Sequence, residues 1–171
     1  LVLGVVTGGG PRSVLPHGEV VRIAPEFRYL TWNPIEYEAF RAVLRPGDVA
    51  LDVGANVGAY AILFGLWVGD AGRVLAFEPA PDAMAGLCRH IDLNRLKHRV
   101  HAVQAAVTDT VGEAGFVSEG SQGTNHLRRG AGDSTTVITV PTTTIDAVCA
   151  EQRVRPRLIK IDVEGAEPLV L

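Results

Sequence analysis

The sequence predicts one α/β domain built on a mainly parallel sheet with flanking helices. Short apolar runs that are typical of buried strands recur along the chain, and segments with helical spacing separate them. The run from Val49 to Val53 precedes the almost wholly apolar helix Ala59 to Val68, and the strand Arg73 to Phe77 precedes the helix Asp82 to Leu93. This alternation is typical of a parallel sheet with right-handed crossover connections.

The second half of the chain predicts further strands and one less regular region. A strand is predicted from Val100 to Val107, and residues Gly112 to Asp133, rich in Gly, Ser, Thr and Asn, predict a hairpin or mobile loop. The β-branched run Thr136 to Val140 predicts another strand. A short helix is predicted from Thr144 to Gln152, with Thr144 as its N-cap. The last predicted element is a buried strand from Leu158 to Asp162.

The residues before this core predict a separate extension. The alternating segment Glu19 to Ile23 predicts a β-ribbon, and the apolar spacing from Pro34 to Leu44 predicts a helix. We therefore divide the chain into an N-terminal extension, residues 1–45, packed on a core of residues 46–171. The chain stops at Leu171 inside what reads as a new helix, so we expect a fragment that lacks the C-terminal strands of its fold.

Composition narrows the function. The chain of 171 residues is 47% hydrophobic and 20% charged, and its net charge of −3 provides no basic field to attract nucleic acid. No apolar run approaches the ~18 residues that a membrane span needs. We expect a soluble cytoplasmic protein whose two cysteines, Cys88 and Cys149, are reduced and half-buried, and we assign no metal site.

The most informative motif lies between the first core strand and the helix that follows it. Asp52 closes the strand, and Gly54, Ala55, Asn56 and Gly58 form the turn. Residues without Cβ let the backbone pass close under a ligand. A dinucleotide fold needs G-x-G-x-x-G for its diphosphate, whereas these glycines are four residues apart and the acid would repel a diphosphate. Asp52 suits a ligand with a cationic end, such as S-adenosylmethionine; the alternative is a plain turn in which Asp52 caps the helix.

Two further strand ends extend this prediction. Glu78 follows the strand Arg73 to Phe77 and precedes Pro79, so its carboxylate could accept both ribose hydroxyls. Ala106 belongs to a run of small residues that could admit an adenine ring. The alternative for Glu78 is a solvated carboxylate without a ligand. The alternative for Ala106 is a strand end that is simply packed in the protein.

Acidic residues also follow the last predicted strand. Asp162 and Glu164 should lie over the same crevice as Gly54, where one could orient a methyl donor and the other could hold or deprotonate an acceptor hydroxyl. The alternatives are a helix amino end with favourable acids, to which we assign Glu167 most readily, and part of a divalent metal site. His126 could act as a general base or be a solvated loop side chain. Surface positions are expected for the other histidines: His17, His90, His98 and His101.

These motifs together resemble the FkbM-type methyltransferases. The family's hallmarks stand at Asp52 to Gly58, Phe77 to Pro79, Ala106 to Asp109, Thr144 to Asp146 and Ile159 to Glu167. The resemblance implies a class I, Rossmann-like methyltransferase fold, S-adenosylmethionine as methyl donor, and methylation of a hydroxyl on a sugar or secondary metabolite. The donor-binding residues we predict are Asp52, Gly54, Ala55, Asn56, Gly58, Glu78, Pro79, Ala106 and Asp162. The catalytic residues we predict are Asp162, Glu164 and His126.

Other functions remain as alternatives at this point. The chain could methylate nitrogen or a macromolecule, or it could be a truncated or degenerate domain that binds the donor without turnover. The glycine spacing and Asp52 disfavour an NAD-dependent oxidoreductase. The partner we expect is a small-molecule hydroxyl acceptor, with no nucleic acid and no membrane, and a homodimer is left open.

Overall fold

The central element of the fold is a four-stranded parallel sheet with the order β10-β3-β4-β5. The computed structural model describes residues 11–117, 126–127, 137–163 and 165–170. The four strands are β3 (Val49–Val53), β4 (Arg73–Phe77), β5 (Val100–Val103) and β10 (Leu158–Ile161). The chain places β4 and β5 on one side of β3 and then returns to place β10 on the other. This reversal is the switch point at which open α/β sheets bind ligands, and the predicted Rossmann-like α/β class is confirmed.

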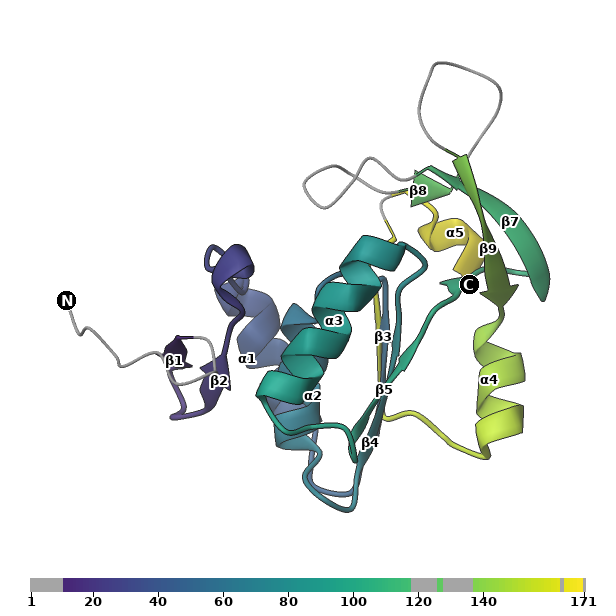
Figure 1. The fold of residues 1–171 in the computed structure, drawn as a ribbon. Helices are drawn as coiled ribbons and strands as arrows, with labels where there is room; N and C mark the ends of the chain where they lie inside the picture. Colours follow the sequence, from purple (N-terminus) through teal and green to yellow (C-terminus); the bar gives the residue numbers. More distant parts are fainter. Residues whose placement is uncertain (1–10, 118–125, 128–136, 164, 171) are drawn as a thin grey trace.

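Helices cover both faces of this sheet (Figure 1). On one face lie α2 (Ala59–Trp67) and α3 (Pro81–Leu93), and on the other lie α4 (Ile145–Gln152) and α5 (Glu167–Val170). A separate apolar cluster lies on each face of the sheet. The strands are therefore buried on both faces, which explains why their sequences are continuous apolar runs. Among the helices that the structure describes, none has the length and apolar character needed to cross a bilayer.

The N-terminal residues form the predicted ribbon and helix. Strands β1 (Arg12–Val14) and β2 (Val20–Arg22) pair in antiparallel fashion, a short 3-10 helix, η1, spans Pro25–Phe27, and α1 spans Pro34–Val43. The Asn33 side chain caps α1 by accepting the first free N–H groups of the helix. Apolar side chains of this region share one cluster with α2 and α3, namely Val21, Ile23, Tyr37 and Leu44. The division of the chain at residue 45 stays a prediction.

The prediction of one strand from Val100 to Val107 was wrong. The strand breaks after Val103, where the Ala105 N–H donates to the Val103 carbonyl, and Gln104 is exposed. The second piece, β6 (Ala106–Val107), joins a separate sheet with the order β6-β9-β7-β8. The local apolar pattern gives no sign of this break. The break arises because β6 pairs with β9, a strand much later in the chain. The other strands of that sheet are β7 (Gly112–Val117), β8 (His126–Leu127) and β9 (Val137–Thr143).

The hairpin prediction for the irregular region is confirmed where the structure describes it. Strands β7 and β9 pair in antiparallel fashion from Gly112↔Thr142 to Val117↔Val137, and β8 pairs with the end of β7. Thr144 caps α4, as predicted, because its hydroxyl accepts the Ala147 N–H.

The surface prediction for His90 was wrong. His90 is 0% exposed, because it lies on the same face of α3 as Leu87 and Ile91. Its Nε2 accepts the Ala24 N–H at 3.0 Å, and its Nδ1 lies 2.6 Å from the Val57 carbonyl oxygen, to which it donates as the neutral ring. This histidine therefore joins the N-terminal segment to the turn before α2. His17, His98 and His101 are exposed as predicted, whereas Cys88, expected to be half-buried, is exposed.

His90 should make stability depend on pH. Burial lowers the pKa of His90 below its ordinary value of 6.5, so the folded protein keeps the ring neutral while the unfolded chain protonates it. The contribution of His90 to the free energy of unfolding is therefore present above the pKa that His90 has in the unfolded chain, and it is lost as pH falls below that pKa. We expect up to about 1.4 kcal/mol to be lost between about pH 7.5 and about pH 5.5. Urea unfolding at both pH values should show this loss, and His90→Gln should flatten it. An equal loss in both proteins would contradict the assignment.

Candidate functional site

The glycine turn after β3 lies at the carboxyl edge of the parallel sheet and is built from close approaches. Gly54 has a φ of 75°, and a Cβ there would lie 1.9 Å from the backbone oxygen of Asp162 at the end of β10. Gly58 has a φ of 91°, and a Cβ there would lie 2.7 Å from Cδ1 of Leu87 on α3. From the sequence, both glycines were expected to let the backbone approach a ligand, and that role stays a prediction. In the structure they admit the neighbouring strand β10 and the helix α3.

The amides of this turn bind the end of β4. The N–H groups of Gly54 and Ala55 donate to the Phe77 carbonyl, at 3.1 and 2.9 Å, and the Asn56 N–H donates to Oε2 of Glu78 at 2.8 Å. Oε1 of Glu78 accepts the Ala80 N–H at 2.9 Å, and Glu78 is only 5% exposed. The two predicted motifs therefore meet, with the Glu78 carboxylate held between them.

A buried ion pair lies beside the turn. Asp52 is 0% exposed, and Nζ of Lys160, on β10, lies 3.2 Å from Oδ1 of Asp52. The same Nζ lies 3.5 Å from Oδ2 of Asp162 and 5.4 Å from the centroid of the Tyr60 ring. Burial raises the pKa of Asp52 above its ordinary 3.8, and the Lys160 charge opposes that rise. Sequence reasoning missed Lys160, although a lysine inside an apolar strand is a signal for a buried partner.

The two predicted acids differ in access. The Asp162 side chain is 67% exposed at the end of β10, whereas that of Asp52 is 1% exposed. A ligand at this edge would therefore meet Asp162. Glu164 lies outside the described residues. Glu167 accepts the N–H groups of Val163 and Gly165, so it closes the turn before α5.

The remaining predicted residues follow Glu78 or belong to the second sheet. Pro79 is buried directly after Glu78, and Ala106, 5% exposed, packs in one cluster with Ala80 and Ala83 at the start of α3. His126 lies on β8, paired with Val117 in the second sheet, and its side chain is outside the described part of the chain. The roles given to these residues stay predictions.

The N-terminal segment reaches the same edge, which the sequence did not predict. The Tyr60 hydroxyl donates to Oε2 of Glu36 at 2.5 Å, and Nε1 of Trp32 donates to the Ala59 carbonyl at 2.9 Å. Burial, together with the Glu36 carboxylate, raises the pKa of Tyr60 above its ordinary value of 10. Residues before and at the start of α1 thus pack over the start of α2.

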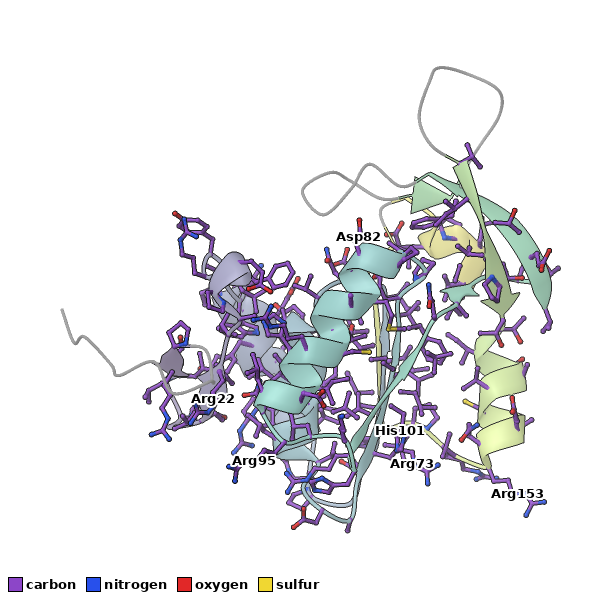
Figure 2. The ribbon with its side chains drawn as sticks, in the orientation of Figure 1. Arg22, Arg73, Asp82, Arg95, His101 and Arg153 are labelled. Carbon is purple, nitrogen blue, oxygen red and sulfur yellow. The ribbon has the colours of Figure 1, made fainter. Side chains whose placement is uncertain are left out.

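A separate hollow lies between one face of β4 and β5 and the elements β9 and α4. Figure 2 shows Asp82, at the start of α3, near the edge that holds the site, and Arg73 and His101 near the other edge. Arg73 and His101 line a cavity of about 510 Å³ together with residues of β9 and α4. Among the residues that the structure describes, none of the predicted donor-binding residues lines this cavity.

Comparisons with known proteins agree with the motifs. Residues 52–171 match the family model described as the methyltransferase FkbM domain. The 31-O-demethyl-FK506 methyltransferase FkbM of Streptomyces tacrolimicus is 45% identical over 71 residues, which are 40% of this chain and 25% of that protein. The match thus spans about a quarter of that relative's length.

Solved structures similar to the chain include two methyltransferases. One is an S-adenosylmethionine-dependent O-methyltransferase from Thermotoga maritima, with 20% identity, a TM-score of 0.41, and coverage of 57% of this chain and 41% of that one. The other is the C-terminal domain of precorrin-6Y C5,15-methyltransferase from Rhodobacter capsulatus, with 28% identity, a TM-score of 0.40, and coverage of 46% and 42%. Because the family model matches more than half of the chain, the chain belongs to the FkbM methyltransferase domain family.

Proposed function

We propose that this chain binds S-adenosylmethionine and is the donor-binding part of a methyltransferase that methylates a hydroxyl of a small molecule. The observation that carries the proposal is the meeting of the glycine turn, Glu78 and Asp162 at the switch point of the sheet. Membership of the FkbM methyltransferase domain family supports the same reaction class.

The residues at this edge fit such a donor. The turn from Gly54 to Gly58 brings the ends of β3 and β10 and the helix α3 close together, at the edge where the donor's methionine part would lie. Glu78 is fixed by two backbone N–H groups, and a carboxylate has enough lone pairs to accept ribose hydroxyls as well. Asp162 is the exposed acid, suited to the donor's α-amino group. When bound, the donor supplies a methyl group on an already activated sulfonium.

The protein would then contribute mainly position. Methyl transfer needs an in-line nucleophile close to the activated carbon, so orientation of the acceptor hydroxyl is the main requirement. Glu164 and His126 remain the proposed groups for holding or deprotonating that hydroxyl. The name of the Streptomyces tacrolimicus relative, a 31-O-demethyl-FK506 methyltransferase, supports an oxygen acceptor on a small molecule. The net charge of −3 supports a partner other than nucleic acid.

Calorimetric titration with S-adenosylhomocysteine tests the donor class, with NAD as the control ligand. We expect binding of S-adenosylhomocysteine in the micromolar range and none of NAD. A screen of sugar and secondary-metabolite hydroxyls with labelled donor then tests the acceptor class. Binding of NAD alone, or of neither ligand, would contradict the proposal.

Replacing Glu78 tests the ribose assignment. Glu78→Ala removes hydrogen bonds from a charged acceptor, which are worth about 1.5 to 3 kcal/mol. We expect affinity for S-adenosylhomocysteine to fall roughly ten- to a hundredfold. Glu113→Ala, at an exposed position on β7, is the matched control and should leave affinity unchanged. Unchanged affinity in a folded Glu78→Ala protein would show that Glu78 does not hold the ribose.

A further inference from the structure

Lys160 connects two acids that differ sharply in exposure. Its Nζ lies 3.2 Å from buried Asp52 and 3.5 Å from exposed Asp162. The Lys160 side chain is only 9% exposed and lies over the Tyr60 ring. One buried cation therefore joins the end of β3 to the end of β10, on either side of the switch point.

A lysine at this position is costly unless it has partners. Burial of an ammonium group is unfavourable without an opposite charge, and Asp52 provides that charge from inside the protein. Asp52 has no access to solvent, so it cannot touch a ligand in this structure. Its ion-pair partner is Lys160, so Asp52 can affect a ligand through the position of the lysine.

The Asp162 carboxylate, in contrast, has few restraints of its own. Its backbone is fixed, because its carbonyl packs against Gly54, but its side chain is 67% exposed. The contact with Lys160 restrains the direction of that carboxylate. The lysine itself is held by Asp52 below and by the Tyr60 ring beside it.

We propose that Lys160 is a positioning residue that orients the Asp162 carboxylate toward the donor, and that Asp52 acts by holding Lys160. This inference rests on the proposed function, because it concerns the same donor site. It assigns the three residues different tasks: Asp162 contacts the donor, Lys160 orients Asp162, and Asp52 anchors Lys160.

A double-mutant cycle between Lys160 and Asp162 tests the proposal. The four proteins are the unmodified chain, K160M, D162N and K160M/D162N, all with Asp52 in place, because Asp52 is the proposed anchor of Lys160. D52N and D52N/K160M form a second pair in which no carboxylate is buried without a counter-ion. If Asp52 acts by holding Lys160, D52N alone lowers affinity and K160M adds less than about twofold to that loss; unchanged affinity in D52N would overturn the anchoring role. Affinity for S-adenosylhomocysteine is measured by calorimetry, and thermal unfolding shows that each is folded. Lys97→Met, on an exposed lysine paired with Asp92, is the control.

If Lys160 acts through Asp162, the two substitutions are not additive. We expect K160M to lower affinity about tenfold when Asp162 is present, a typical loss for a group that orients a ligand-binding side chain. When Asp162 is already Asn, K160M should lower affinity less than about twofold. An equal loss in both backgrounds, or no loss in either, would overturn the positioning role. Failure of the unmodified chain to bind S-adenosylhomocysteine would overturn the proposed function, and this inference with it.

Discussion

Replacing Gly54 by alanine is expected to destabilise the protein by about 3 to 5 kcal/mol. Two causes add. Alanine is strained at a φ of 75°, and its Cβ would lie 1.9 Å from the Asp162 backbone oxygen, which cannot move away as a flexible side chain could. Because β10 would have to shift relative to β3, the donor site should also be lost. Urea unfolding and calorimetric titration with S-adenosylhomocysteine measure the two effects.

Gly47 provides the matched control for this prediction. Its φ of 93° is in the same left-handed region, but a Cβ there would have no atom within 4 Å. Gly47→Ala should therefore cost only the backbone strain, about 1 to 2 kcal/mol, and should leave affinity for S-adenosylhomocysteine unchanged. Equal destabilisation by the two substitutions would show that the contact with β10 is unimportant.

Replacing Lys160 by methionine is expected to destabilise the protein by about 3 to 5 kcal/mol, because the Asp52 carboxylate is then buried without its counter-ion. The pKa of Asp52, already raised by burial, should rise further once the lysine is gone. Asp52→Asn in the same protein removes the unpaired charge and should recover most of the lost stability. Urea unfolding of the single and double variants measures both effects.

Lys97→Met is the control for the loss of a lysine as such. The pair of Lys97 with Asp92 has a short distance, 2.7 Å, but both side chains are exposed, so its loss should cost less than about 1 kcal/mol. If D52N/K160M were as unstable as K160M, the buried charge would not be the cause of the instability.

The sequence predicted those parts of the fold that depend on local pattern. Strands β3 and β4 have the predicted bounds, because each is a short apolar run between a turn and a helix. The glycine turn and Glu78 were placed together because parallel strands end at the same edge of the sheet. The sequence motifs at the strand ends also predicted the family, and the match to the family model confirms it.

The features that the sequence did not predict depend on partners far away in the chain. His90 was judged by its polarity, but its ring binds Ala24 and Val57, which no local pattern connects to it. The break between β5 and β6 depends on pairing of β6 with Thr142 and Thr143. Asp52 was expected to face a ligand, whereas its position opposite Lys160 follows from the register of β3 with β10.

The hydrogen bonds of the glycine turn also limit how the site could be redesigned. In a dinucleotide fold, free backbone N–H groups of this turn and of the following helix receive a diphosphate. Here the N–H groups of Gly54, Ala55 and Asn56 are already bonded to the end of β4, and one of the acceptors is the Glu78 carboxylate. An engineered G-x-G-x-x-G sequence alone would therefore not create a nucleotide-phosphate site in this chain, since an incoming anion would have to displace another anion from the same amide.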